Sequence, residues 1–296
     1  MSMLTWVDGA VCQSIAVDDR GLLLADGAFE TLRWSGLGVF RKEFHIARLI
    51  AGLTAMAFDD PAKCAAQAFD QLNIALSSLA TREDGFEREE GLARITITRG
   101  SGPRGYAPSS MAIPRIVISL FMGNCVSPAP GRMILAKTRW PTQPQFAGFK
   151  LLARTEQVLA AHEALQAGAV DALMLGQNNT VISSATGNIF ARYGGSLLTP
   201  KLDKAGIAGT RRAVILSDLS ARLGFEVREV RLSLADVMKA DEVFTSNSVV
   251  GIRAIAELYT GATTTDQTEH SIPTTRTWSD FSASAALALL IHGEPV

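Results

Sequence analysis

The segment that most constrains how this chain can fold is residues 123–131, Gly-Asn-Cys-Val-Ser-Pro-Ala-Pro-Gly. It holds two glycines and two prolines among its residues. Because these residue types interrupt helices and strands, the segment is typical of a linker. We therefore predict two domains, 1–122 and 132–296, on either side of it. A chain of 296 residues with 47% hydrophobic content can form a core in each of them.

Hydrophobic periodicity predicts that both domains mix strands and helices, which makes the fold α+β. Residues 94–99 alternate in polarity, as strands do, whereas apolar residues at 46, 49, 50 and 53 follow a helical period. In the first domain we expect strands at 5–7, 10–14, 28–34, 92–99 and 114–122 and helices at 44–53 and 61–80. In the second we expect strands at 133–137, 172–175, 181–183, 188–193, 226–230, 241–245 and 252–255, helices at 151–168, 210–223, 234–240 and 281–292, and a loop at 261–277.

The composition argues against several classes of protein. With 28 basic and 29 acidic residues the net charge is −1, which gives no basic surface for nucleic acid. The three cysteines, Cys12, Cys64 and Cys125, have no CxxC spacing, which argues against structural zinc and for a reducing compartment. The N-terminus lacks the pattern of a signal peptide, and the apolar run 285–291 is too short to span a bilayer. We expect a soluble, cytoplasmic protein.

Lys150 is the first candidate for chemistry. Apolar residues at 151, 152, 158, 159 and 165 show a helical period, so we expect Lys150 at or just before the first turn of a helix. A cation is disfavoured there by the helix dipole, and Phe146 and Phe149 are apolar neighbours. Burial lowers the pKa of a lysine and yields the neutral amine that attacks carbonyl groups. Lys150 is therefore a candidate Schiff-base lysine, and the alternative is a solvated surface lysine.

Two polar segments of the second domain suit an anionic ligand. Gly209 precedes a helix that opens with Thr210, Arg211 and Arg212. Arginines in a first turn oppose the helix dipole unless an anion is bound, and the N–H groups there form a natural phosphate site. The alternative is a plain glycine cap with exposed arginines. Residues 246–251 form a second polar turn that could hold an anion.

Arginines of the first domain could meet carboxylates. The glycine-rich loop 100–106 presents Arg104 and Tyr106, and a guanidinium group matches a carboxylate with two hydrogen bonds. The alternative is a plain turn with a solvent-exposed arginine. In strand 28–34, alternation puts Glu30 on one face and Thr31 and Arg33 on the other, so Arg33 is either a surface charge or a carboxylate contact. Arg48 lies at the edge of an apolar helix face, where an arginine usually extends its charge to water.

A lysine amine for an aldehyde and several donors for a phosphate are what pyridoxal phosphate needs from a protein. With this set, the chain resembles the fold type IV pyridoxal-phosphate enzymes, or class IV aminotransferases, and within them it is most similar to aminodeoxychorismate lyase. The resemblance covers essentially the whole chain and implies a smaller N-terminal α/β domain and a larger C-terminal pseudo-barrel domain. The motifs that carry it are Asp26–Thr31, His45–Leu49, Arg99–Tyr106, Ala147–Lys150, Arg154–Gln157, Thr199–Gly206 and Ser246–Ile252.

The resemblance implies which residues bind the cofactor. Lys150 matches the lysine that binds the cofactor aldehyde and then transfers protons. Arg48 matches the arginine that holds the phosphate. Thr210 and Arg211 match the residues whose backbone N–H groups complete the phosphate site. Ser248 falls where many members place a hydroxyl on the phosphate.

Ser183 departs from the family pattern. Members carry a glutamate in Val-x-Glu-x-x-x-x-Asn-x-Phe, and its carboxylate keeps the pyridine nitrogen protonated; in residues 181–190 that position is Ser183. A serine hydroxyl can hydrogen-bond a neutral pyridine but supplies no charge. We hypothesise that Ser183 weakens carbanion stabilisation, which harms a transaminase more than a lyase whose elimination forms an aromatic ring. The rival explanation is a different substrate or lost activity.

The reaction that the resemblance implies converts 4-amino-4-deoxychorismate to 4-aminobenzoate and pyruvate in folate synthesis, without a metal. Arg33, Arg104 and Tyr106 would hold substrate carboxylates, and the last two are often presented across a homodimer interface. One alternative is an aminotransferase acting on D- or branched-chain amino acids. Another is a pyridoxal-phosphate-binding homologue with weak activity.

Overall fold

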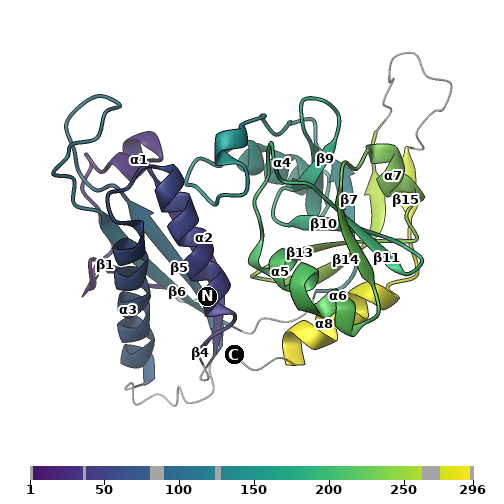
Figure 1. The fold of residues 1–296 in the computed structure, drawn as a ribbon, viewed down its shortest axis with the longest axis horizontal. Helices are drawn as coiled ribbons and strands as arrows, with labels where there is room; N and C mark the ends of the chain where they lie inside the picture. The colour runs from purple at the N-terminus through teal and green to yellow at the C-terminus, as the bar shows by residue number, and fades with distance from the viewer. Residues whose placement is uncertain (1–2, 36–37, 81–89, 124–127, 262–273, 294–296) are drawn as a thin grey trace. The chain divides into compact units, whose positions relative to one another are not determined.

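The computed structural model describes residues 3–35, 38–80, 90–123, 128–261 and 274–293. They form two compact units, each with its own sheet and helices (Figure 1). The first unit takes in Met1–Cys125 and also Phe149–Ala153. The second takes in Val126–Gly148 and Arg154–Glu294. The mixture of helices and strands confirms the α+β prediction.

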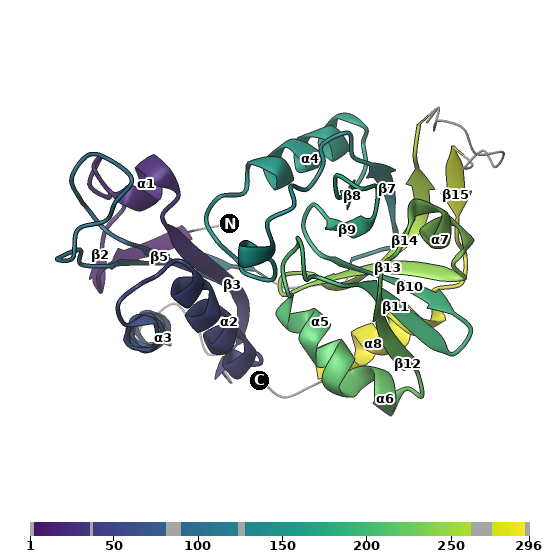
Figure 2. The same ribbon diagram turned by 45° about the horizontal axis from the view of Figure 1, so that its top comes forward.

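The first unit is an antiparallel sheet with two long helices on one face, as Figure 2 shows. The strand order is β2-β1-β6-β5-β3-β4. The strands are β1 Met3–Val7, β2 Ala10–Val11, β3 Gly27–Ser35, β4 Gly38–Val39, β5 Gly91–Thr98 and β6 Arg115–Met122, and the helices are α1 Arg20–Leu24, α2 Lys42–Ala55 and α3 Pro61–Ala80. The predicted alternation of β5 is confirmed, since Ala93, Ile95 and Ile97 are buried and the residues between them are only half-buried.

Residues 149–153 extend this sheet although they are far away in the sequence. The Phe29 N–H donates to the Lys150 carbonyl at 3.1 Å, and the Leu152 N–H donates to the Gly27 carbonyl at 3.0 Å. Leu151 pairs with Ala28 in an antiparallel bridge and is buried. Gly27 allows close strand packing, because a Cβ there would lie 2.1 Å from the Ile97 carbonyl oxygen. The segment therefore continues the edge of β3 as an added strand.

The second unit is built on a mixed sheet that curls back on itself. Its order is β12-β11-β10-β13-β14-β7-β8-β9, with β15 paired to β14, and β9 also packs against β10 and β11. The strands are β7 Gly131–Leu135, β8 Asp171–Leu175, β9 Val181–Ser184, β10 Asn188–Tyr193, β11 Ser196–Pro200, β12 Glu226–Val230, β13 Glu242–Asn247, β14 Gly251–Tyr259 and β15 Thr275–Thr277. The helical elements are η1 Pro144–Phe146, α4 Thr155–Gln166, α5 Thr210–Val214, η2 Ile215–Leu219, α6 Ser220–Arg222, α7 Leu234–Lys239 and α8 Ser282–Gly293.

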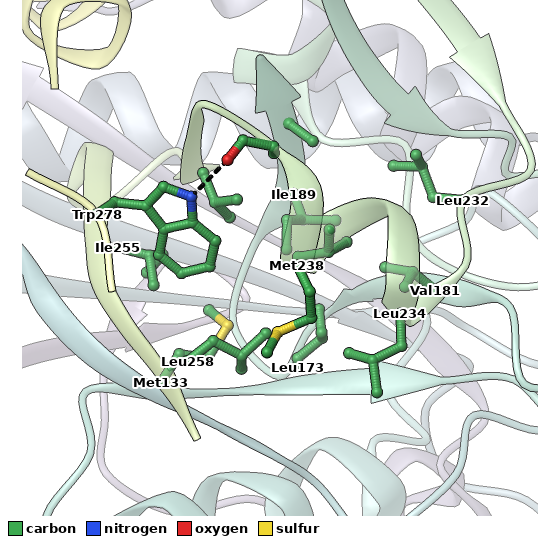
Figure 3. Packing of buried hydrophobic residues seen from close by; sticks show 14 of the residues in the cluster. Met133, Leu173, Val181, Ile189, Leu232, Leu234, Met238, Ile255, Leu258 and Trp278 are labelled. Carbon is green, nitrogen blue, oxygen red and sulfur yellow. Dashed lines mark hydrogen bonds between the residues drawn. The ribbon is translucent and has the colours of Figure 1, made fainter. Parts of the chain in front are cut away.

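Two hydrophobic clusters occupy the second unit. One surrounds Trp278, whose indole N–H donates to the Ala240 carbonyl at 2.8 Å (Figure 3). The other lies under α4 and includes Ala160, Ala164 and Met174. The rings of Phe190 and Phe244 stack with their centres 5.0 Å apart, and they come from paired positions on β10 and β13. These clusters fix the positions of the strands that carry Ser183, Asn188 and Ser246.

Several expected elements differ from the structure. The helix predicted to begin at Leu151 begins at Thr155, because residues 149–153 pair with β3 instead. The strand expected at 10–14 is limited to Ala10–Val11, and Gly131, assigned to the linker, already belongs to β7. The predicted loop at 261–277 ends in β15, while 262–273 lie outside the described residues, as do 36–37, 81–89 and 124–127. In the described ranges no helix has the length and hydropathy needed to cross a membrane.

Candidate active site

Lys150 stands on the extended segment beside β3, where its side chain is half-buried. Its Nζ lies 4.2 Å from the centre of the Phe29 ring. Leu151, the next residue, is buried beside Gly52 of α2. Because successive side chains of an extended segment point to opposite faces, burial of Leu151 directs Lys150 toward the Phe29 face. The lysine is therefore positioned by strand pairing, and not by a helix start as predicted.

Arg94 shares this face of the sheet, and the sequence reasoning missed it. Its guanidinium carbon lies 3.9 Å from the Phe29 ring centre, and Nε donates to Thr96 Oγ1 at 3.2 Å. Burial lowers the pKa of Arg94. The sequence does contain one indication of Arg94, since it is the single charged residue of strand 92–98. In the sheet it pairs with Thr31. An anionic ligand beside Phe29 would be attracted to this partly desolvated cation.

Arg33 lies on the same face as Phe29, two positions beyond Thr31 on β3. Its Nη2 is 3.3 Å from Oε2 of Glu90. Three basic side chains, those of Lys150, Arg94 and Arg33, thus come from one face of this sheet. The role of Arg33 in binding a substrate carboxylate remains a prediction.

Arg48 is held by a buried carboxylate on the other side of β3. Glu30 is fully buried; it accepts from Arg48 Nε at 2.7 Å and Nη2 at 2.5 Å, and its Oε2 lies 2.7 Å from His45 Nδ1. Burial acts to raise the pKa of Glu30, but the Arg48 charge and the hydrogen bonds from Arg48 and His45 outweigh it and lower the pKa to about 2. Since Phe29 and Glu30 are consecutive in β3, the Lys150 contact and the Arg48 ion pair form on opposite faces of the strand.

The predicted role of Arg48 is compatible with this ion pair. A guanidinium group has five N–H donors in a fixed plane, and Glu30 engages the Nε–Nη2 edge. Glu30 thereby sets the direction in which Arg48 presents its other donors, a feature that the sequence reasoning did not identify.

The loop with Arg104 and Tyr106 is held through its backbone. Arg20 donates from Nη1 to the Gly105 carbonyl at 3.0 Å and from Nη2 to the Tyr106 carbonyl at 2.6 Å. Arg20 is buried, and its Nε donates to Asp26 Oδ2 at 2.8 Å. The Tyr106 side chain is 88% exposed. The predicted carboxylate-binding side chains therefore project from a loop whose backbone is fixed.

Replacing Arg20 with methionine is expected to raise KM for the substrate several-fold with a smaller change in kcat, because the loop loses two hydrogen bonds. The control is Arg99→Met. Arg99 also donates to Asp26, at 2.9 Å, but its other donors bond the Met56 and Ala57 carbonyls. It should lower stability without raising KM. An unchanged KM in folded Arg20→Met would rule out the loop's role in substrate binding.

In the second unit, Gly209 is the N-cap of a helical run that continues from Thr210 through α5, η2 and α6. Asn188 makes two hydrogen bonds to this helix start. Its Nδ2 donates to the Ile207 carbonyl at 2.8 Å, and its Oδ1 accepts from the Gly209 N–H at 3.1 Å. Gly148 N–H donates to the Gly206 carbonyl at 2.9 Å. The bridge between Gly148 and Ile207 therefore helps to fix the segment that leads into this helix.

The two arginines of this helix are buried, which contradicts the alternative of exposed arginines. Arg212 donates to the Pro200 carbonyl at 3.0 Å and pairs with Glu229. Its charge is therefore balanced within the protein, and no bound anion is needed to explain it. Thr210 and Arg211 are buried as well.

Ser183 is buried in β9, and its hydroxyl donates to the Ser184 carbonyl at 2.8 Å. The residue after Ser183 is bonded to a carboxylate. Asp171 accepts hydrogen bonds from Ser184 Oγ at 2.7 Å and from Thr186 Oγ1 at 2.6 Å. Burial raises the pKa of Asp171, although the bonds from Thr186 and Ser184 oppose the shift. Asp171 therefore stabilises the turn between β9 and β10.

Ser248 lies in the turn after β13, where Asn247 Oδ1 accepts from the Val249 and Val250 N–H groups, each at 2.9 Å. Two residues earlier, Ser246 is buried, and its Oγ has no hydrogen-bond partner among the described residues. A buried hydroxyl without a partner is costly, so such groups commonly meet a ligand or water. This donor set fits a phosphate-bearing cofactor.

The residues predicted to bind the cofactor and substrate divide between the units. Lys150, Arg48, Arg33, Arg104 and Tyr106 belong to the first unit, and Ser183, Thr210, Arg211 and Ser248 belong to the second. In the first unit, the half-buried amine of Lys150 suits the aldehyde of pyridoxal phosphate. In the second unit, a glycine-capped helix start and an unsatisfied hydroxyl suit its phosphate. Residues 27–258 match the family model described as Amino-transferase class IV.

The chain belongs to the class IV aminotransferase family. It is 31% identical to an aminodeoxychorismate lyase of Vibrio harveyi over 255 residues, which are 85% of this chain and 90% of that protein. A crystal structure of 4-amino-4-deoxychorismate lyase from Pseudomonas aeruginosa matches with a TM-score of 0.81 and 30% identity, covering 98% of this chain and 99% of that one.

An aminotransferase from Brucella abortus, solved with bound pyridoxal phosphate, has the same fold with a TM-score of 0.76 and 17% identity, covering 98% of this chain and 97% of that one. The class IV fold and pyridoxal phosphate as the cofactor are thus confirmed. The roles of the individual residues remain predictions.

Proposed function

We propose that this class IV enzyme is a lyase that converts 4-amino-4-deoxychorismate to 4-aminobenzoate and pyruvate. The similarity to aminodeoxychorismate lyases over nearly the whole chain supports this reaction. The observation that carries it is the grouping of Arg33 and Arg94 on the same sheet face as Lys150. The proposed substrate has two carboxylates, whereas a branched-chain amino acid has one, and each carboxylate suits one arginine.

Bound through Lys150, pyridoxal phosphate supplies an electron sink for the carbon that bears the substrate amine. Once the substrate amine has displaced it from the cofactor aldehyde, the free Lys150 amine would accept the proton from that carbon. The C–O bond to the enolpyruvyl group on the neighbouring carbon then breaks, and the ring becomes aromatic. Lys150 returns the proton to the departing fragment, which becomes pyruvate. In this scheme Arg33 and Arg94 hold the two carboxylates, and Arg104 and Tyr106 add contacts to them. Arg48, Thr210, Arg211 and Ser248 hold the phosphate.

A keto acid separates the lyase from the main alternative, an aminotransferase. The purified, cofactor-loaded protein should release 4-aminobenzoate from aminodeoxychorismate at the same rate with and without an added keto acid. An aminotransferase would instead need the keto acid as amino acceptor. Turnover of D- or branched-chain amino acids, seen only with a keto acid and without 4-aminobenzoate release, would replace this proposal with the aminotransferase.

Ser183 should limit the electron sink if it faces the pyridine nitrogen. Replacing Ser183 with glutamate is expected to change lyase turnover and to shift the pH dependence of the cofactor's visible spectrum, because a carboxylate favours a protonated pyridine. The control is Ser183→Gln, which introduces a side chain of the size of glutamate without its charge. It should leave the pH dependence of the cofactor's visible spectrum unchanged. Identical turnover and spectra in Ser183→Glu and the unsubstituted enzyme would refute the hypothesis.

The exposed apolar residues of the first unit favour a homodimer. Val17, Leu22, Leu23 and Tyr106 are all more than half exposed. They lie on two segments joined by hydrogen bonds, from Arg20 to Tyr106 and from Ser101 to Asp18. Exposed apolar groups gathered in this way are typical of an interaction surface. Such a dimer would also place Tyr106 against a partner subunit.

Replacing both Leu22 and Leu23 with glutamate is therefore expected to convert the dimer to a monomer in light scattering coupled to size exclusion. Leu289→Glu, at an exposed position of α8, is the matched control and should leave the mass unchanged. A dimer of unaltered stability in the double variant would exclude this surface as the interface.

A further inference from the structure

Ser246 carries a polar group that the protein itself leaves unsatisfied. The residue lies in β13 and is only 1% exposed, and its Oγ is among the buried side-chain atoms without a hydrogen-bond partner in the described part of the chain. Other buried serines of the second unit are bonded: Ser183 donates to the Ser184 carbonyl, Ser184 donates to Asp171 Oδ2, and Ser284 donates to the Phe281 carbonyl. A buried hydroxyl that makes no hydrogen bond lowers the stability of the folded protein. Its presence therefore calls for a partner that binds from outside the chain.

The strand register shows which way the Ser246 hydroxyl points. Ser246 pairs with Asn188, as Phe244 pairs with Phe190 and Glu242 with Arg192. In the last two pairs the side chains meet on one face, as a ring stack and as an ion pair at 3.1 Å. Because the side-chain period of a strand is two, Ser246 and Asn188 share that face. Ser246 therefore points to the side on which Asn188 acts.

The hydrogen bonds of Asn188 show that the start of helix α5 lies on this face. Both ends of its amide bond the segment just before Thr210, at Ile207 and at Gly209. Gly209 must lack a side chain there, because a Cβ would lie 2.0 Å from Asn188 Oδ1. The Ser246 hydroxyl thus lies on the same face as the side chain that fixes this helix start.

We propose that Ser246 is a cofactor-binding residue whose hydroxyl donates a hydrogen bond to the phosphate of pyridoxal phosphate. The proposal rests on the proposed binding of that phosphate by Thr210 and Arg211. A phosphate oxygen is an acceptor with high charge, and it satisfies a hydroxyl that has no other acceptor. Ser246 would then act together with Ser248, two residues later in the chain.

The test is binding of pyridoxal phosphate and of pyridoxal, which lacks the phosphate, to the cofactor-free Ser246→Ala protein. Loss of a hydrogen bond to a charged group is expected to weaken pyridoxal phosphate binding about 10-fold or more. Pyridoxal affinity should not change. The cofactor-free variant should be at least as stable to urea as the unsubstituted protein, because it loses only an unsatisfied group. No substrate is used, so the outcome does not depend on which reaction the enzyme catalyses.

Ser284→Ala is the matched control, since it removes a buried hydroxyl that is already bonded. It should lower stability and leave the affinity for both ligands unchanged. If Ser246→Ala does not fold, Ser246→Cys keeps the size with a weaker donor and should weaken only pyridoxal phosphate binding. Equal affinity of the variant and the unsubstituted protein for pyridoxal phosphate would overturn the proposal, as would an equal loss for both ligands.

Discussion

Replacing Lys150 with alanine is expected to lower product formation by a factor of about 10²–10⁴ or more, because the variant loses both the amine that binds the cofactor aldehyde and the group that moves the protons. The fold should survive. The backbone bonds of Lys150 to β3 do not involve its side chain, and the side chain is half-buried. Steady-state rates and a urea unfolding curve on the same preparation measure both properties.

Two controls separate the chemistry of Lys150 from a general loss of charge. Lys201→Ala removes an exposed lysine of the second unit and should retain full activity. Borohydride treatment of the cofactor-loaded enzyme, followed by peptide mapping, should place the cofactor's mass on the peptide that contains Lys150. Labelling of a different lysine, or full activity of Lys150→Ala, would show that the assignment is wrong.

Replacing Glu30 with glutamine is expected to destabilise the enzyme by about 3–5 kcal/mol, since it leaves the largely buried Arg48 without its carboxylate. Pyridoxal phosphate affinity should fall as well, because Arg48 loses the partner that sets its direction. Glu257→Gln is the control. Its ion pair with Arg132 is about one-third exposed, and its loss should cost less than about 1 kcal/mol. If Glu30→Gln has the same free energy of unfolding as the unsubstituted enzyme, the buried pair contributes little to stability.

The pH dependence gives a second check on Glu30. Its pKa is about 2 in the folded chain against an ordinary value of 4.5, so its contribution to stability is complete above about pH 4.5 and is lost as the pH falls toward 2. The contribution amounts to about 3 kcal/mol from the size of this shift. The stability difference between the unsubstituted enzyme and Glu30→Gln should therefore narrow below pH 4.5. A difference that stays constant down to pH 3 would contradict the coupling.

Local patterns were sufficient where local sequence decides the structure. The alternation of residues 94–99 correctly predicted β5, and the apolar period of 44–53 correctly predicted α2. The helix predicted from Leu151 failed over its first turn, because β3 offers a hydrogen-bonding edge to residues 149–152 and no local pattern reports that edge. The strand at 196–200 was missed for the same reason, since its partners include β12, about thirty positions later.

The candidate site shows the same division. Lys150, Arg48, Thr210 and Ser248 were predicted from the sequence, because the motifs that contain them occur in the order and spacing of the family. Arg94, Glu30 and Arg20 were not, because their importance depends on contacts across the sheets. Ser246 was included only as part of the polar turn 246–251, without a role of its own. Arg94 matters because its guanidinium group meets the ring that Lys150 also meets. Ser246 matters because no neighbour satisfies its hydroxyl, and a missing partner cannot be inferred from sequence.

The most direct test of the account is product release from aminodeoxychorismate by the purified, cofactor-loaded enzyme, with Lys150→Ala measured in parallel. The account predicts pyruvate and 4-aminobenzoate in equal amounts, without any added keto acid, and at least about 100-fold slower release of both products from Lys150→Ala. If the enzyme binds the cofactor and yet releases neither product, the lyase assignment is contradicted.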